Sequence, residues 1–302
     1  MMLWRRGGLA VILRASGRDL IEQTRWATGG AIAGAAVAPD GRLFYAKPGP
    51  PNGADLPTAL VRVYRPDPAS PTGYTATADL GPLIGAPGAL SLDSFGNLAA
   101  LTSLSGDGGI PQTLFNLFDA TPDDPSGFTL WLAMWPFGQA TTVCGGADGS
   151  LLLLAAQRAI VALVGDIHNP NNPVTVWDGR NAGRGPWIEA AAIATGPGGE
   201  LHVLDGCTGI LQVAQVDTST GRFSAMASGA TRELPDGQIT QPAGLAIDRN
   251  GAALILNRTP NGGRSVLQFR REAGAGAAVA SRSQATRALD PGAWRPVPDA
   301  TT

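Results

Sequence analysis

A short pattern of apolar and polar positions recurs along the chain. Each copy is a run of apolar residues, a polar turn that contains a glycine, and a second apolar run. Short apolar runs on either side of a glycine turn predict two antiparallel strands joined as a β-hairpin. The five copies span residues 31–47, 88–102, 141–156, 190–205 and 242–257.

The turn glycines of these hairpins are evenly spaced. They are Gly41, Gly96, Gly149, Gly199 and Gly251, at intervals of 55, 53, 50 and 52 residues. We predict that each has a positive φ, which tight hairpin turns require and which glycine adopts without steric cost. A period near fifty residues indicates a repeat protein.

Each copy is followed by a second predicted hairpin. Its first strand is expected at residues 60–65, 114–118, 160–164, 211–216 and 266–270. After a turn-rich segment, its second strand is expected at 74–80, 128–135 and 174–177 in the first three copies. Four strands per repeat at this period are typical of a β-propeller blade.

The N-terminus supplies a sixth second hairpin, at residues 9–14 and 20–26, without a first hairpin before it. The missing hairpin is expected at the C-terminus, where residues 288–294 resemble a degraded copy of residues 37–43. We therefore predict an all-β fold, a six-bladed β-propeller that forms a single domain over residues 1–302. Its last blade is closed by C-terminal inner strands and N-terminal outer strands, which removes free sheet edges. A five-bladed ring with the N-terminal hairpin as an appendage is the alternative.

The fifth copy resembles an NHL-type repeat. It has the pattern Pro-x-Gly-apolar-Ala-apolar-Asp over Pro242–Asp248, a turn at Asn250-Gly251, and a strand that ends in Phe269. Asn257 stands where the NHL pattern has Asp. The resemblance implies an NHL-like six-bladed propeller, a fold used mostly by binding modules but also by related metal-dependent lactonases. Because one fold serves both classes, the resemblance leaves the function open.

Composition narrows the classes of partner and location. Charged residues make up 15% of the chain and the net charge is −2, so we expect no nucleic-acid partner held by phosphate contacts. No apolar run approaches the roughly 18 residues of a membrane-spanning helix. Arg14 interrupts the short N-terminal apolar stretch, so no signal peptide is expected. We expect a soluble protein in the cytoplasm, or in a particle assembled there.

Several catalytic and cofactor motifs are missing from the sequence. There is no GxSxG nucleophile elbow and no phosphate-binding GxxxxGK[ST] loop. Cys144 and Cys207 have no zinc-ligand spacing with the two histidines, His168 and His202. We therefore expect no cofactor.

Three residues support a metal-dependent lactonase or lyase-like hydrolase as an alternative. Glu189, Asp205 and Asn257 lie where innermost strands begin or second strands end, and their oxygens could hold a divalent metal in the central channel. Lys47, and either Ala155 or Ala156, occupy neighbouring equivalent places, which argues against such a site. In the competing interpretation Asp205 caps a turn and Asn257 accepts backbone hydrogen bonds.

One loop is rich in residues that bind partners. Trp177, Arg180, Arg184 and Trp187 fall within eleven residues, and Trp and Arg are enriched at the centres of protein interfaces. The same residues could stack on sugars, or the segment could be a blade linker with buried tryptophans.

The favoured function is a non-catalytic propeller that binds a protein partner within a larger assembly. Propellers attached to phage-tail-like machines are an analogy for such an assembly. A carbohydrate-binding propeller is a further alternative, although the loops differ between the copies and do not predict identical sugar pockets.

Overall fold

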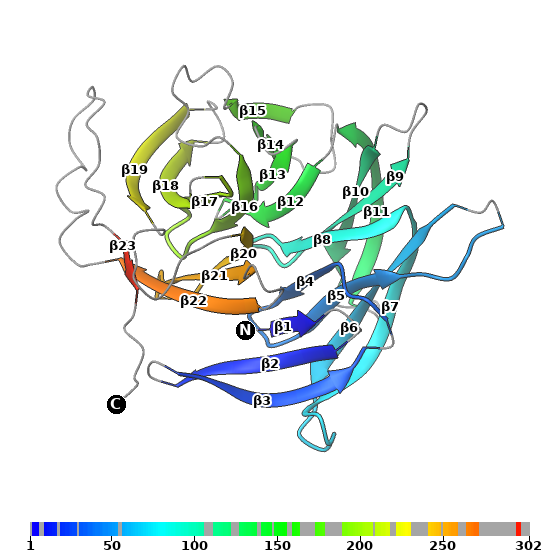
Figure 1. Ribbon diagram of the computed structural model, residues 1–302. Coiled ribbons are helices and arrows are strands. Elements are labelled where there is room, and N and C mark those ends of the chain that lie inside the picture. Colours follow the sequence, from blue (N-terminus) through cyan, green and yellow to red (C-terminus); the bar gives the residue numbers. More distant parts are fainter. Residues whose placement is uncertain are drawn as a thin grey trace. The chain divides into compact units, whose positions relative to one another are not determined.

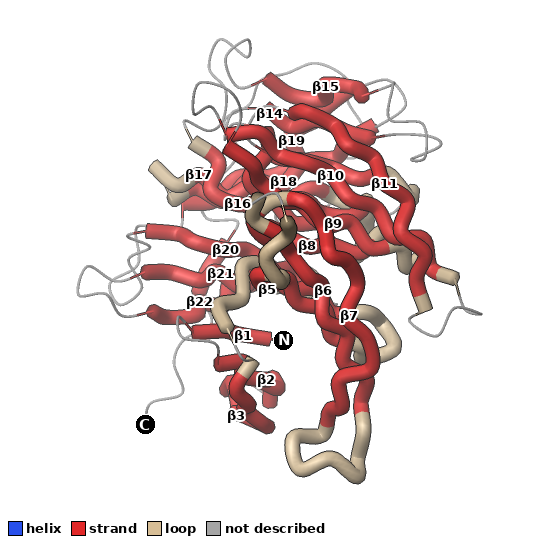
Figure 2. Tube along the Cα trace, turned by 90° about the vertical axis from the view of Figure 1, so that its right-hand side faces the viewer, coloured by secondary structure: helices blue, strands red, loops and turns tan. Residues whose placement is uncertain are grey.

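The computed structural model describes eighteen segments of the chain. They are residues 2–5, 9–16, 19–28, 30–53, 56–105, 111–121, 127–137, 140–146, 148–155, 159–163, 173–178, 189–207, 209–217, 222–230, 241–248, 250–258, 264–271 and 294–296. These segments contain strands and turns and no helix, as Figure 2 shows. The predicted all-β class is confirmed.

The described strands form antiparallel sheets, labelled in Figure 1. A three-stranded sheet holds β1 (Met2–Arg5), β2 (Leu9–Ser16) and β3 (Asp19–Ala27). Two four-stranded sheets follow, with strands β4 (Gly34–Val37), β5 (Leu43–Pro48), β6 (Thr58–Pro66) and β7 (Tyr74–Ile84), then β8 (Ala86–Leu92), β9 (Leu98–Ser105), β10 (Pro111–Ala120) and β11 (Phe128–Phe137).

The remaining strands make three more four-stranded sheets. The first contains β12 (Ala140–Gly145), β13 (Leu151–Ala155), β14 (Ala159–Leu163) and β15 (Pro173–Asp178). The second contains β16 (Ala190–Thr195), β17 (Leu201–Asp205), β18 (Ile210–Asp217) and β19 (Arg222–Ala230). The third contains β20 (Gln241–Ile247), β21 (Ala253–Arg258), β22 (Arg264–Arg271) and β23 (Trp294–Pro296). Strands that follow one another in the sequence are neighbours in each sheet, which confirms the predicted hairpins.

The five glycine turns share one geometry. Gly41, Gly96, Gly149, Gly199 and Gly251 have φ values of 86°, 87°, 83°, 79° and 77°. In each turn the glycine N–H donates to the carbonyl of the residue three positions earlier. The N–H of that earlier residue donates in turn to the carbonyl of the residue that follows the glycine. The prediction of positive φ at all five glycines is confirmed.

Aspartate side chains complete two of these turns. Asp93 Oδ1 accepts the N–H groups of Phe95 and Asn97 at 2.8 and 2.9 Å. Asp248 Oδ1 accepts the N–H groups of Asn250 and Ala252, both at 2.8 Å. A carboxylate that accepts two backbone N–H groups favours the turn locally in these two copies.

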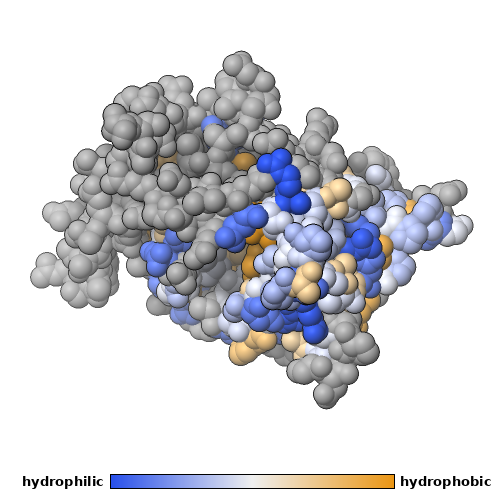
Figure 3. Space-filling view, turned by 90° about the horizontal axis from the view of Figure 1, so that it is seen from below, coloured by the Kyte–Doolittle hydropathy of each residue, from blue (hydrophilic) through white to orange (hydrophobic). Residues whose placement is uncertain are grey.

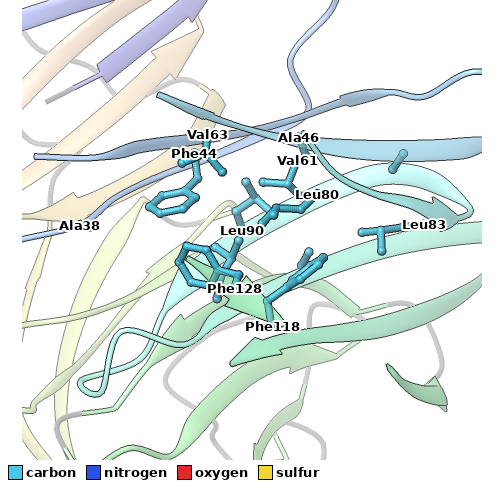
Figure 4. Close-up of a cluster of buried hydrophobic side chains, with 13 residues drawn as sticks. Ala38, Phe44, Ala46, Val61, Val63, Leu80, Leu83, Leu90, Phe118 and Phe128 are labelled. Carbon is cyan, nitrogen blue, oxygen red and sulfur yellow. The ribbon is translucent and has the colours of Figure 1, made fainter. Parts of the chain in front are cut away.

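The chain divides into two compact units, and the boundary falls between Val143 and Cys144. In the first unit a core lies between the sheets β4–β7 and β8–β11 (Figure 4). The rings of Phe44 and Phe128 meet edge to face, with centroids 5.4 Å apart, and Phe118 lies in the same cluster. The single-domain prediction is not tested by this division and stays a prediction.

The three-stranded sheet packs on the sheet β4–β7 through aromatic side chains. The hydroxyls of Tyr45 and Tyr64 are 2.7 Å apart, and the Tyr64 ring lies 5.5 Å from Trp26 on β3. Burial and the hydrogen bond with Tyr64 raise the pKa of the Tyr45 phenol well above its ordinary value.

In the second unit, the described residues of the sheets from β12 to β23 include two apolar clusters. One is built on Leu152, Leu154, Ile193 and Val203, and the other on Leu211, Ile255 and Phe269, all of them buried. His202 is also buried, and its Nε2 lies 3.3 Å from Glu200 Oε1.

The strand pairing at the chain ends differs from the predicted closure. The strand beside β2 is β1, where Met2 to Arg5 pair with Ile12 to Leu9, and not a C-terminal strand. The C-terminal strand β23 pairs with β22 instead. A short connection joins β1 to β2, so this pairing closes a smaller loop than pairing with the far end of the chain would. Residues 288–293, predicted as part of the missing hairpin, lie outside the described segments.

Candidate functional site

Five residues occupy one repeated position in the second strand of their sheets, at the end of that strand or within three residues of it. Each is the sixth residue after its turn glycine: Lys47, Thr102, Ala155, Asp205 and Asn257. Thr102, Asp205 and Asn257 are buried, with exposed fractions of 2%, 0% and 3%. The prediction that Asp205 and Asn257 lie at strand ends is confirmed.

Asp205 and Glu189 are both bonded to the turn after β17. Asp205 Oδ1 accepts the N–H of Cys207 at 2.8 Å, which is the predicted turn cap. The Glu189 carbonyl accepts the N–H of Gly206 at 2.6 Å, and the Cys207 thiol lies 3.4 Å from Glu189 Oε2. Two carboxylate side chains and a thiol therefore gather at this turn, with Asp205 buried and both Glu189 and Cys207 exposed.

Asn257 lies at the same end of the neighbouring sheet. Its Oδ1 accepts the N–H of Gln241 at 3.1 Å, as the competing interpretation predicts. The inner strands β16 and β20 of the two sheets pack against each other, and Asn257 pairs with Pro242 as Asp205 pairs with Ala190. Both side chains thus hold backbone amides next to an inner strand.

The described residues contain no group of three His, Cys, Asp or Glu side chains arranged to hold a metal ion. Glu189, Asp205 and the Asn257 amide can supply oxygens, which suit a hard cation such as Ca²⁺ or Mg²⁺. Hydrogen bonds to Cys207 and Gln241 already engage Asp205 and Asn257, so a metal would have to share these oxygens. The metal site stays a prediction.

The predicted aromatic and guanidinium loop is only partly described. Trp177 belongs to β15, and its backbone pairs with Ile160. Arg180, Arg184 and Trp187 lie outside the described residues. The proposed role of these four residues stays a prediction.

The connection between β5 and β6 stands out among the five that follow a second strand. It runs over residues 49–57, while the others cover 106–110, 156–158, 206–209 and 259–263. It projects from its sheet at the right of Figure 1. Together with Pro48 it carries four prolines, so we call residues 48–57 the proline loop; residues 54 and 55 are not described.

The proline loop groups exposed apolar side chains. Leu56 is 43% exposed, and Ile84, on the neighbouring strand β7, is 42% exposed. Pro48, Pro50, Pro51 and Pro57 are exposed beside them. In the view of Figure 3, apolar residues of the described surface form small areas among hydrophilic ones. Single exposed apolar residues are ordinary, but a cluster marks a contact surface.

Hydrogen bonds hold the proline loop in place. Gly49 N–H donates to the Thr58 carbonyl at 2.8 Å, and Leu56 N–H donates to Asn52 Oδ1 at 3.0 Å. Gly85 N–H donates to the Pro57 carbonyl at 2.7 Å, which places Leu56 and Ile84 on adjacent segments. The prolines are visible in the sequence, but the proximity of Leu56 and Ile84 depends on strand pairing between β6 and β7.

Comparison with known proteins identifies the fold of the chain but assigns it to no family. No protein-family model matches the chain, and no curated protein matches it. A chain of the crystal structure of a nidogen/laminin complex matches with 11% identity, 88% coverage of both chains and a TM-score of 0.56. A functionally unknown protein from Desulfotomaculum acetoxidans matches with 8% identity and a TM-score of 0.55, covering 90% of this chain and 74% of that one.

A gluconolactonase from Xanthomonas campestris has a lower TM-score of 0.47, with 14% identity over 79% of this chain and 72% of that one, too low to support an argument. The chain has a β-propeller fold. The number of blades and the NHL-type repeat stay predictions. In the described part of the chain, no helix is long and apolar enough to cross a membrane.

Proposed function

We propose that this chain is a non-catalytic β-propeller module that binds a protein partner through the proline loop and Ile84. The observation that carries the proposal is that Leu56 and Ile84, both more than two-fifths exposed, lie on adjacent segments joined by the hydrogen bond from Gly85 N–H to the Pro57 carbonyl. A partner that covered this part of the surface would bury both side chains.

The energetics favour such a contact. Burying the exposed part of one leucine or isoleucine side chain stabilises a complex by about 1 kcal/mol, judged from roughly 1.5–3 kcal/mol for the whole side chain. In the described part of the loop, the hydrogen bonds of Gly49 and Leu56 hold the backbone in place, which lowers the conformational entropy lost on binding. The fold is compatible with this role, since the matched nidogen/laminin chain belongs to a protein complex.

Other exposed apolar residues fit the role less well. Phe95 is 72% exposed, but it stands alone in the β8–β9 turn, between Ser94 and Gly96. Ile84 precedes β8 and Phe95 follows it, so these residues lie at opposite ends of that strand. Phe95 is therefore a matched control position for the proline loop.

Site-specific photocrosslinking tests the proposal. Benzoylphenylalanine replaces Ile84 in one version of the chain and Phe95 in the other, and each is expressed in the organism that encodes the protein. We expect a discrete crosslinked product from position 84 that disappears when Leu56→Asp is added. No product from position 84, or the same product from both positions, would overturn the proposal.

A further inference from the structure

We infer that Arg42 and Arg65 form a binding site for a phosphate group. Arg42 directly precedes β5, and Arg65 lies near the end of β6. The proline loop follows the other end of β5, so this site is separate from the surface that the proposed function uses. The inference is carried by the convergence of the two guanidinium groups on one point beside Gly127.

The two side chains converge because their strands pair. Leu43 pairs with Tyr64 in the ladder between β5 and β6. Arg42 and Arg65 are the next opposite positions, so they project from the same face of the sheet. A Cβ added at Gly127 would lie 3.4 Å from Arg42 Nη1 and 3.7 Å from Arg65 Nη2, so these two nitrogens are at most about 7 Å apart.

The charges of this pair are only partly balanced by the described residues. On the same strand, Arg62 donates to both carboxylate oxygens of Asp79 at 2.6 Å. Arg42 instead donates to Asp40 through Nε alone, at 2.6 Å. Within the described segments the Arg65 guanidinium has no ion-pair partner. Like charges opposite each other on paired strands are destabilising, and an anion between them would remove that cost.

The Arg42 guanidinium is held in position for a ligand. Its Cζ lies 5.3 Å from the ring centroid of Phe128 and 5.7 Å from that of Phe44, two residues of the core shown in Figure 4. These cation–π contacts and the bond to Asp40 fix the plane of the guanidinium. The Arg42 side chain is 22% exposed and Arg65 is exposed, so an anion can reach both from solvent.

Two guanidinium groups favour a phosphate group over a carboxylate. Each guanidinium presents parallel N–H donors that bind a pair of oxygens. A carboxylate has one such pair and satisfies one guanidinium, whereas a tetrahedral phosphate has enough oxygens for both. Charge-assisted contacts of about 2.8 Å let one phosphate bridge nitrogens roughly 5–8 Å apart. Free phosphate, small phosphate esters and phosphorylated side chains share this chemistry.

Phenylglyoxal, which modifies accessible guanidinium groups, tests the inference on the full chain. Peptide mapping by mass spectrometry follows the rate at Arg65, and Arg62 is the control within each sample because Asp79 already binds it. Inorganic phosphate, the tripeptide Ala-phosphoserine-Ala and acetate are titrated separately. Arg42→Gln removes one half of the site. Its matched control, Arg62→Gln, removes the same charge from the other face of the sheet.

We expect inorganic phosphate at ten times its dissociation constant to slow the modification of Arg65 about tenfold, since the site is then empty about one-eleventh of the time. This protection should persist in Arg62→Gln and vanish in Arg42→Gln, with Arg62 still slow to react in the second variant. Stronger protection by the phosphoserine tripeptide would identify a phosphorylated partner, and equal protection a free phosphate or ester. No protection by either, or equal protection by acetate, would overturn the inference.

A second comparison tests whether the chain supplies its own anion. Asp123 and Asp124 lie between Thr121 and Gly127 in the sequence, outside the described residues. Slow modification of Arg65 without phosphate that Asp123→Asn with Asp124→Asn accelerates would show that these carboxylates occupy the site, and would overturn the inference. None of these outcomes bears on the crosslink from position 84, so the phosphate site and the proposed function are tested separately.

Discussion

Replacing Gly34 with alanine tests how closely the inner strands β4 and β8 pack. A Cβ at Gly34 would fall against the carbonyl oxygen of Gly88, and it would lie 2.9 Å from both the Ala89 Cα and the Leu90 nitrogen. Real Cβ contacts are essentially never shorter than 3.0 Å. All three neighbouring atoms belong to the backbone, so no side chain can rotate away and one strand must move.

The size of the effect follows from two opposing contributions. Overpacking of a well-packed interior costs about 1–3 kcal/mol, and a contact with backbone belongs at the upper end of that range. Replacing glycine by alanine also restricts the unfolded chain, which returns about 0.4–1 kcal/mol. We therefore expect Gly34→Ala to lower the free energy of unfolding by about 2–3 kcal/mol.

Urea unfolding followed by tryptophan fluorescence measures this difference. Gly30→Ala is the matched control, because a Cβ there has no heavy atom within 4 Å and its φ is not positive. The control should be neutral or more stable than the parent chain. The midpoints are compared at equal slopes, which guards against a change in the unfolding mechanism. Equal midpoints for Gly34→Ala and Gly30→Ala would refute the close packing of β4 on β8.

Three further predictions concern a phenol, the thiols and a metal. The pKa of Tyr45 is raised, so its phenol should stay protonated at about pH 11 in the folded chain. The Tyr45 phenol contributes stability at pH values below the unfolded-state pKa of about 10, and this stability is lost as the pH rises toward the pKa of the folded state. The absorbance of phenolate measures the titration, with Tyr45→Phe as the reference. Burial raises the pKa of Cys144 to about 12, so a thiol reagent at about pH 8 should modify only the exposed Cys207, and Cys207→Ser should leave the folded chain unreactive. We expect Ca²⁺, Mg²⁺, Mn²⁺ and Zn²⁺ to leave the melting temperature unchanged; a rise that Glu189→Ala with Asp205→Ala abolishes would instead favour the lactonase-like alternative.

The hairpins could be predicted from sequence because their turns are determined locally. Gly96 supplies the positive φ, and Asp93 supplies the carboxylate that accepts two nearby N–H groups. Both contributions act within five residues, so they leave a readable pattern. The apolar strands on each side then pair by proximity, and their register follows from the turn.

The pairing at the chain ends could not be predicted in this way. The strand β1 is only four residues long and carries no turn signal of the repeating kind. Its pairing with β2 competes with pairing to strands far away in the sequence, and the outcome depends on loop closure and packing across sheets. The repeat pattern therefore predicted the hairpin of β2 and β3, but it predicted a C-terminal strand beside β2, where the structure has β1.

For the candidate sites too, the sequence predicted the features that are determined locally and not those that depend on distant segments. Position predicted that Asp205 and Asn257 end their strands, because each stands six residues after a turn glycine. Their partners are the amides of Cys207 and Gln241, and which amides these are depends on the backbone path of the adjoining segments. That Leu56 and Ile84 lie on adjacent segments could not be predicted from the sequence either, because the two positions are 28 residues apart.

The repeated strand-end position argues for one specialised surface. It holds Lys47, Thr102, Ala155, Asp205 and Asn257, five side chains with different chemistry. Three of them hydrogen-bond to backbone groups: Thr102 to the Ile84 carbonyl, Asp205 to the Cys207 amide and Asn257 to the Gln241 amide. The fold thus uses this position to satisfy buried backbone groups, a requirement that any polar side chain of suitable length can meet. Function is then free to reside in the connections; among the five that follow a second strand, the one over residues 49–57 is the longest and carries three prolines. Shortening residues 49–57 to the length of the 206–209 connection should leave the sheets folded and remove partner binding, and retention of the position 84 crosslink in that variant would contradict this division of roles.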